Sequence, residues 1–169
     1  MLKNQRFINP GLLIAAYIGT IIAANWMTST FGLVPVGFGL AVTAGTFAAG
    51  AALLLRDAVQ TVAGKTVAFA AILAGIVVSY FVSDPFVAIA SAVAFAASEL
   101  VDFAVFTPLR KRNLAWAVLA SSVVSAPVDT VLFLHIAGFD LTWQAVAGQF
   151  IVKTAMALIV AAWITLKRK

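Results

Sequence analysis

The chain has no cysteine and a single histidine, His135, among its 169 residues. Without cysteine it forms neither disulfides nor thiolate metal sites, and one histidine argues against a histidine-based metal centre. Charge is scarce as well: 10% of the residues are charged, whereas a typical soluble domain has about 25%. This shortage excludes an ordinary water-exposed surface, so we expect a protein of the lipid bilayer.

Motifs for catalysis are also missing. The sequence contains neither a GxxxxGK[ST] phosphate loop nor a GxSxG nucleophile motif, so any ATP hydrolysis would belong to another chain. His135 has no evident serine partner for an intramembrane protease. We therefore expect no enzymatic activity, no cofactor and no metal site. The net charge of +5 does not indicate a nucleic acid partner, because the basic residues lie between apolar segments.

Apolar residues make up 63% of the chain and gather in continuous runs. Each run approaches the roughly 20 residues that a helix needs to cross the hydrocarbon core, whereas strands of a membrane barrel alternate apolar and polar residues. Glycine, proline or aspartate separates the runs. We predict an all-α integral membrane protein with one six-helix transmembrane domain over residues 1–169. The predicted helices cover about 10–28, 37–55, 66–82, 86–106, 114–136 and 142–166.

Basic residues outside these helices all fall on one side of a six-helix arrangement. They precede the first segment, lie between the second and third and between the fourth and fifth, and follow the sixth. The other side has only Asp84 and Asp140. Positive loops favour the cytoplasm, so we expect a multi-pass protein of the cell (inner) membrane with both termini cytoplasmic. The first run is longer than the 7–15 apolar residues of a signal peptide, which favours a membrane helix.

Four charged residues lie inside the predicted helices: Glu99, Asp102, Asp129 and Lys153. A charge in lipid is costly and usually faces a cavity, a partner or a transport path. At a rise of about 1.5 Å per residue, Glu99 lies about 20 Å and Lys153 about 16 Å from the outer ends of their helices, and Asp129 about 22 Å from the inner end of its helix. Glu99 and Asp102 are three apart and share one helix face.

Two amides extend this series of polar groups. Asn25 lies late in the first helix, and Gln149 lies one turn from Lys153 on the same face. The series suits a permeation path. The alternative is that Lys153 forms a buried ion pair with Asp129 or Glu99, which would hold helices together and is compatible with transport.

The fifth helix combines Ser121, Ser125 and Asp129 on one face, with Pro127 between the last two. Proline removes a backbone donor, so we expect a kink beside a polar site. Serine alone often serves helix packing, but serine, aspartate and proline together at one depth indicate a functional site.

Other charges have simpler interpretations. Asp102, near the inner surface, could pair with Arg110 or Lys111. We interpret Arg56 and Asp57, which end the second predicted helix, as an interfacial pair.

Small residues recur at four-residue spacing in the first two helices, at Ala15, Gly19 and Ala23 and at Gly45 and Ala49. Such faces let helices approach closely. We expect them to pack inside the bundle; the alternative is docking of another membrane protein, and a homodimer is allowed.

Three stretches, "SELVDFAVFTPLRKR" (98–112), "PVDTVLFLHIAGF" (127–139) and "GQFIVKTAMAL" (148–158), resemble signature segments of the queuosine precursor transporter family, also called the VUT or vitamin uptake transporter family. The stretch "VPVGFGLAVTAGTFAAGAALLLRDAVQ" resembles the second-helix region of its shorter members. The resemblance implies import of 7-cyano- or 7-aminomethyl-7-deazaguanine. It also implies a fold like that of the substrate-binding subunits of energy-coupling-factor transporters.

The resemblance also implies a substrate-binding site, because polar motifs of the family match residues of this chain. A deazaguanine edge offers adjacent N–H and NH₂ donors, which an acceptor-only carboxylate can bind side by side. Glu99 is the first candidate for that role and Asp129 the second, and Gln149, Asn25 or Lys153 could bind the carbonyl of the base. The expected substrate-binding residues are Glu99, Asp129, Gln149, Lys153, Asn25, Asp102, Ser125 and Phe103.

Three classes of function remain open at this point. The chain could be a stand-alone carrier for a small heterocyclic base, or a substrate-binding subunit for another vitamin-like solute that needs a separate ATPase module. It could also be a membrane adaptor without transport activity, although an adaptor seldom needs four buried charges at staggered depths.

Overall fold

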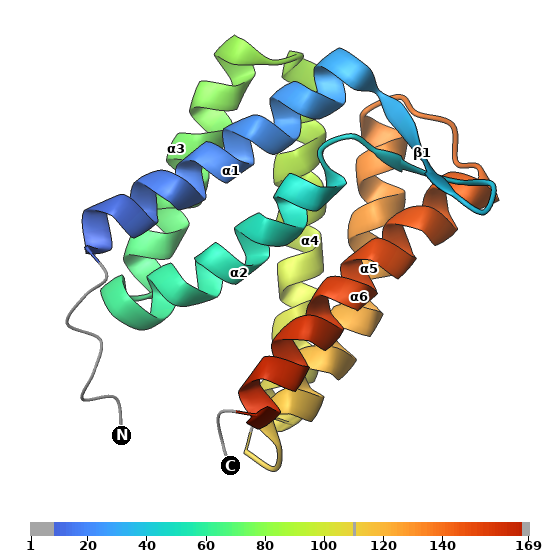
Figure 1. Cartoon of the computed structure of the whole chain (residues 1–169). Helices are drawn as coiled ribbons and strands as arrows, with labels where there is room; N and C mark the ends of the chain where they lie inside the picture. The colour runs from blue at the N-terminus through green and yellow to red at the C-terminus, as the bar shows by residue number, and fades with distance from the viewer. Residues whose placement is uncertain (1–8, 110, 167–169) are drawn as a thin grey trace.

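The computed structural model describes the backbone of residues 9–109 and 111–166. Within these ranges it does not describe the side chains of residues 53, 54, 57, 61, 103, 163 and 164. Helices dominate the described chain, and a two-stranded hairpin follows the first of them (Figure 1). The elements are α1 (Pro10–Phe31), β1 (Leu33–Gly37), β2 (Leu40–Thr43), α2 (Thr46–Ala63), α3 (Lys65–Val82), α4 (Pro85–Leu109), α5 (Leu114–Ile136) and α6 (Trp143–Leu166).

Side chains just before three helices explain where those helices begin. The Asn9 side chain accepts from the Gly11 N–H before α1, and the Asn113 side chain accepts from two N–H groups of α5. The Asp84 Oδ1 accepts from the N–H groups of Phe86 and Val87 at the start of α4. These bonds satisfy helix donors that have no partner within the helix.

The hairpin is the main departure from the predicted helices. Residues 37–45 were expected to begin the second helix, but they hold the hairpin turn and β2, and α2 begins at Thr46 and ends at Ala63. The turn residues Gly37, Phe38 and Gly39 all have positive φ, which a helix does not allow. A short apolar run is consistent with either a strand or a helix. Here the glycines on both sides of Phe38 favour a turn between two strands. The expectation of a helix at 37–45 was therefore wrong.

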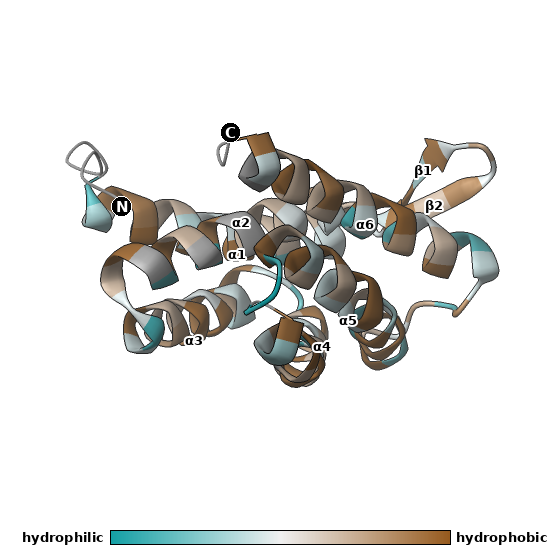
Figure 2. Cartoon of the chain, turned by 90° about the horizontal axis from the view of Figure 1, so that it is seen from below, coloured by the Kyte–Doolittle hydropathy of each residue, from teal (hydrophilic) through white to brown (hydrophobic). Residues whose placement is uncertain are grey.

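Five helices of the described chain are long and apolar enough to cross a membrane. These spans are Pro10–Phe31, Lys65–Val82, Pro85–Leu109, Leu114–Ile136 and Trp143–Ala162. The remaining helix, α2, carries Arg56, Asp57 and Gln60 in its second half. The chain is thus a mostly α-helical, multi-pass membrane protein, and a sixth crossing by α2 stays a prediction. Much of the helical ribbon in Figure 2 is brown, the colour of hydrophobic residues, in agreement with the composition of a membrane protein.

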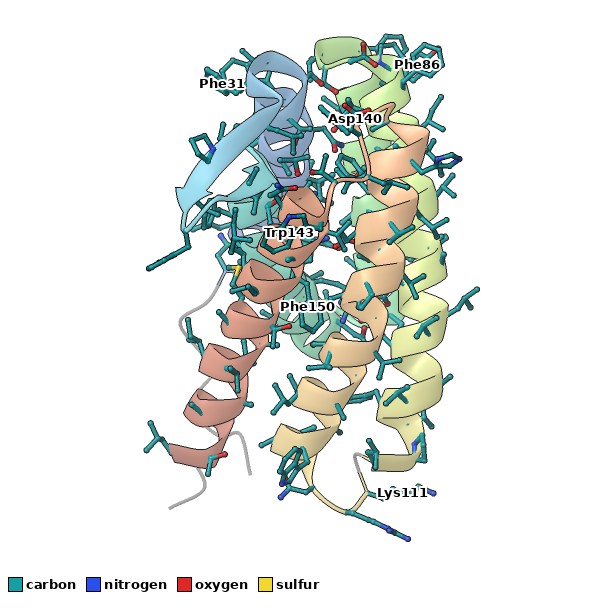
Figure 3. The ribbon with its side chains drawn as sticks, turned by 90° about the vertical axis from the view of Figure 1, so that its right-hand side faces the viewer. Phe31, Phe86, Lys111, Asp140, Trp143 and Phe150 are labelled. Carbon is teal, nitrogen blue, oxygen red and sulfur yellow. The ribbon has the colours of Figure 1, made fainter. Side chains whose placement is uncertain are left out.

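The helices form two groups that meet along α4 and where α6 packs against β2 and α2. In Figure 1, α1, α2 and α3 lie on one side of α4, and α5 and α6 lie on the other. Tyr17 of α1 is 1% exposed and packs with Val59 of α2 and with Ala68 and Ala71 of α3, which forms the core of the first group. Figure 3 shows Phe31, Phe86 and Asp140 at one end of the molecule and Lys111 at the other. The acidic and basic connections therefore lie at opposite ends.

Glycines allow the closest contacts between elements. A Cβ on Gly45 would overlap the Ala24 carbonyl of α1, and a Cβ on Gly148 of α6 would overlap the Ala41 carbonyl of β2. The small-residue face expected at Gly45 and Ala49 therefore packs against α1 at Gly45. The face expected at Ala15, Gly19 and Ala23 does not pack at its centre, because a Cβ on Gly19 would have no described atom within 4 Å.

Candidate functional site

The ammonium group of Lys153 lies at the centre of a polar cluster between α5 and α6. Its Nζ donates to Asp129 Oδ2 at 2.5 Å, to Thr130 Oγ1 at 3.0 Å and to Gln149 Oε1 at 3.3 Å. An ammonium has three N–H donors and no acceptor, so these bonds use its full capacity. The Lys153 side chain is only 9% exposed. The cluster therefore solvates a buried cation completely with protein groups.

Asp129 links this cluster to α4 and keeps spare acceptor capacity. Its Oδ1 lies 3.5 Å from the Ser98 hydroxyl, at the limit of a hydrogen bond. A carboxylate offers about four lone-pair sites, and the bonds from Lys153 and Ser98 occupy only part of them. The side chain is 28% exposed. Asp129 is therefore an oriented acceptor that a further donor can reach.

The cluster lies deep within the spanning helices. At a rise of about 1.5 Å per residue, Lys153 lies about 15 Å from the start of α6 and Asp129 about 10 Å from the end of α5. These two helix ends are joined by the loop that carries Asp140. The helix α5 runs through Pro127 from Leu114 to Ile136 without interruption. The predicted pairing of Lys153 with a carboxylate is confirmed, and its partner is Asp129.

Two buried amides have donors without partners. Gln149 is 1% exposed and Asn25 is 2% exposed. The Gln149 Nε2 and Asn25 Nδ2 atoms are inaccessible, and no described residue forms a hydrogen bond with either of them. A buried unpaired donor is unfavourable, so each is a candidate for a ligand contact.

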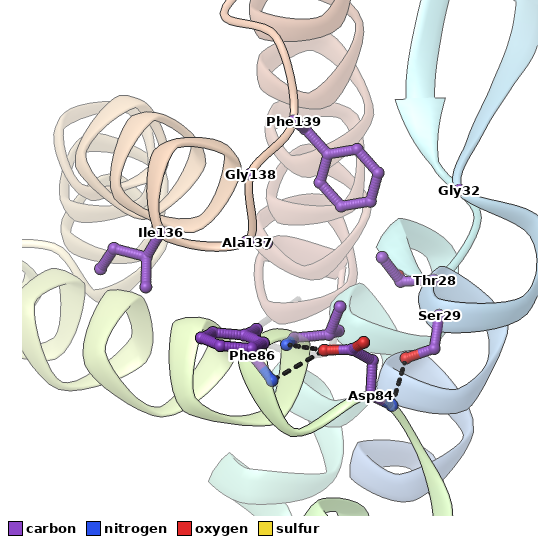
Figure 4. Close-up of a pocket in the computed structure, with 10 residues that line it drawn as sticks. Thr28, Ser29, Gly32, Asp84, Phe86, Ile136, Ala137, Gly138 and Phe139 are labelled. Atoms are coloured by element: carbon purple, nitrogen blue, oxygen red, sulfur yellow. Dashed lines mark hydrogen bonds between the residues drawn. The ribbon is translucent and has the colours of Figure 1, made fainter.

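A cavity of about 430 Å³ opens at the acidic end of the molecule, between α1, the α3–α4 connection and the α5–α6 loop. Phe139 lies on one side of it and Asp84 and Phe86 on the other (Figure 4). The Phe139 ring stacks on Phe133, with centroids 6.4 Å apart and planes at 30°. The cavity also contacts Thr28, which lies one turn along α1 from Asn25. It therefore combines an aromatic wall with polar groups on the side that leads to the buried amide of Asn25.

Residues 79–167 match the family model described as "Putative vitamin uptake transporter". The chain belongs to the vitamin uptake transporter family. No curated protein and no solved structure matches it. The matched residues cover α4, α5 and α6, which supply Ser98, Asp129, Gln149 and Lys153 to the cluster. The family assignment makes the protein a multi-pass membrane transporter and is consistent with a non-enzymatic function.

In this vitamin uptake transporter, Glu99 forms an ion pair with Arg56 of α2. The Arg56 side chain is 14% exposed and that of Glu99 is 37% exposed. The expectation that Arg56 and Asp57 end their helix was wrong, because α2 continues to Ala63. The expected pairing of Arg56 with Asp57 involves a side chain that lies outside the described part of the chain. The pair of Arg56 and Glu99 connects the first group of helices to the second.

Two further expected site residues, Ser125 and Asp102, form no described bond with the Lys153 cluster. Ser125 is buried in α5 and Asp102 lies one turn beyond Glu99, and no hydrogen bond of either side chain is found among the described residues. The side chain of Phe103 and the residue Arg110, an expected partner of Asp102, lie outside the described part of the chain.

Sequence reasoning missed two members of the cluster, Ser98 and Thr130. Both are hydroxyl residues directly next to a charged residue of a membrane helix, Glu99 and Asp129 respectively. That adjacency was the available signal. Among the described residues, no three histidine, aspartate or glutamate side chains gather closely enough to hold a metal ion.

Proposed function

We propose that this chain imports a queuosine precursor, a 7-cyano- or 7-aminomethyl-7-deazaguanine, or a similar small heterocycle across the cell membrane. The observation that carries the proposal is the deep cluster in which a partly exposed carboxylate, Asp129, lies beside a buried amide, Gln149, with an unpaired donor. Transport paths are places where membrane proteins retain buried ionisable groups.

The chemistry of the cluster suits the edge of a deazaguanine base. That edge presents an exocyclic NH₂, a ring N–H and a carbonyl in a row, which are two donors followed by an acceptor. Asp129 offers acceptor sites to the two donors, and the Nε2 of Gln149 offers a donor to the carbonyl. Both residues bind the same ammonium group, so they are close enough to meet one edge of one base.

The aromatic cavity supports a path for a flat substrate toward this cluster. It lies at the end of the molecule opposite Lys111. Under the positive-inside rule that end faces outward and both termini lie in the cytoplasm. A base would meet the Phe139 wall, where stacking on an aromatic ring contributes about 1–3 kcal/mol, before it reaches the buried groups.

The structure favours a change in the order of the two candidate carboxylates. Glu99, the first candidate from sequence, is engaged by a guanidinium group from α2. Asp129 keeps unused acceptor sites beside an unpaired donor, so we assign the substrate contact to Asp129. Glu99 then serves mainly to connect the two helix groups, and Asp102 lies toward the inner mouth of the path.

Uptake in bacteria that can neither make nor import deazaguanines tests this proposal. Cells expressing the chain receive either base, and queuosine in transfer RNA is assayed. We expect the parent and Glu99→Gln to restore queuosine and Asp129→Asn to lose most of it. Asp140→Asn makes the same chemical change at an exposed aspartate of the α5–α6 loop and serves as the matched control. No restoration by a parent protein that is present in the membrane would reject the substrate.

A second candidate is a substrate-binding subunit for another vitamin-like solute, energised by a separate ATPase module. The exposed small-residue face at Ala15 and Gly19 favours it, because that face is open to a neighbouring helix. Uptake by reconstituted vesicles that contain this chain alone, without ATP, would reject the need for such a module.

A further inference from the structure

We infer that Lys153 sets the orientation of the Gln149 amide, so that the site selects bases with a carbonyl at ring position 6 over bases with an amino group there. The inference rests on the proposed function, since it takes Asp129 and Gln149 as the groups that meet the base. It assigns Lys153 a positioning role without contact to the substrate.

The first step is the saturation of the ammonium group. Its three donors already face Asp129, Thr130 and Gln149 at 2.5, 3.0 and 3.3 Å. A fourth acceptor would have to displace one of these partners, and Thr130 is fully buried. A carbonyl of the substrate therefore finds no free donor on Lys153.

The second step concerns the amide of Gln149. The oxygen and nitrogen of an amide have nearly the same shape, so the surrounding hydrogen bonds decide which way the group turns. Lys153 has donors only, and it therefore holds the oxygen. The nitrogen is turned away from Lys153 as a buried donor without a partner. In this arrangement the free hydrogen-bonding group of Gln149 is its donor, because its oxygen is turned toward Lys153.

The third step is the consequence for the ligand. A carbonyl next to the ring N–H satisfies the Gln149 nitrogen, and the carboxylate of Asp129 takes the neighbouring donors. An amino group in the carbonyl's place would set two donors against each other. The neighbouring ring nitrogen of such a base also carries no hydrogen, so Asp129 would lose one of its two donors. Sites that hydrogen-bond a substrate group discriminate strongly against an analogue that cannot form the bond.

Equilibrium binding to purified protein in detergent tests the inference with two ligands, 7-cyano-7-deazaguanine and its counterpart with an amino group at position 6. We expect the parent to bind the 6-oxo base more tightly. Gln149→Leu should weaken that binding about ten- to hundredfold. Gln149→Glu, an acceptor in place of the donor, should shift the ratio of the two affinities toward the 6-amino base. The change in the ratio isolates position 149, because Asp129 is the same in parent and variant.

The role of Lys153 is tested by the same ratio. Lys153→Met frees the amide to turn, so the preference for the 6-oxo base should fall to the part that Asp129 supplies through the ring N–H. Lys153→Arg should retain the full preference because arginine also has donors only. A purely structural Lys153 would lower both affinities and leave their ratio unchanged, which would overturn the inference. If Lys153→Met does not fold, the ratios of affinities of Lys153→Arg and Gln149→Glu test the inference: the first should match the parent, and the second should shift toward the 6-amino base.

The outcomes separate this inference from the proposed function. If the parent binds neither base, both fail. The parent could bind the 6-oxo base while Gln149→Leu and Gln149→Glu show the same ratio of affinities for the two bases as the parent. In that case the proposed binding site stands and the role of the Gln149 amide is rejected.

Discussion

Replacing Lys153 by methionine should destabilise the protein more than any charge change at its surface. The substitution keeps the length of the side chain and removes the ammonium, which leaves the Asp129 carboxylate without its cation and the Gln149 oxygen without a donor. Removal of one partner of a buried ion pair costs about 3–5 kcal/mol. Asp129 is 28% exposed, so water can partly replace the lost partner. We therefore expect the lower end, about 3 kcal/mol.

The measurement is equilibrium unfolding in mixed detergent micelles, followed by the fluorescence of the four tryptophans. Lys111→Met makes the same change at an exposed lysine and should alter the free energy of unfolding by less than about 0.5 kcal/mol. The double variant Lys153→Met/Asp129→Leu removes both charges and should recover most of the loss, because apolar replacement of a whole buried pair is often neutral. If the effects of the two single substitutions simply add in the double variant, the pair is not coupled and the reasoning is refuted.

Three further predictions concern packing, the second ion pair and orientation. Gly148→Ala should lower the free energy of unfolding by about 1–3 kcal/mol, because the added Cβ meets the backbone of β2. Gly19→Ala, where the added Cβ lies in open space, should not destabilise the protein. Equal effects of the two substitutions on thermal unfolding would contradict this packing. Arg56→Glu should lower the thermal stability, because it sets two carboxylates against each other. The double variant Arg56→Glu/Glu99→Arg should restore part of the stability, since the two charges are again opposite. No restoration would mean that the two side chains do not interact. The chain has no cysteine, so Lys111→Cys provides a single labelling site; a membrane-impermeant maleimide should modify it only after permeabilisation, and labelling in intact cells would reverse the orientation.

Several features of the site could be predicted from single residues in the sequence. Asp129, Lys153 and Gln149 stand out because a charge or an amide in a continuous apolar run is too costly to be accidental. Their spacing along the helices also gives their depth without any knowledge of packing. The identity of the residues that form the cluster was therefore largely accessible before the structure.

The pairing of those charges was not accessible in the same way. Lys153 could have met Asp129 or Glu99, and depth alone did not separate them. The choice depends on which helices pack together: α5 packs on α6, so Asp129 reaches Lys153, and α2 turns toward α4, so Arg56 reaches Glu99. These are contacts between residues far apart in the chain.

The sequence by itself determined that the protein lies in a membrane, since so few charges leave a 169-residue chain no other way to cover its surface. It also singled out Asp129, Gln149 and Lys153 as polar groups within the membrane helices. Only the tertiary structure decided that Gly37 to Gly39 turn an apolar run into a hairpin, which moves α2 along the chain and brings Arg56 inside the bundle. The hydrophobic pattern of the sequence indicates which residues avoid water. The partner of a buried charge depends instead on which helix packs against it.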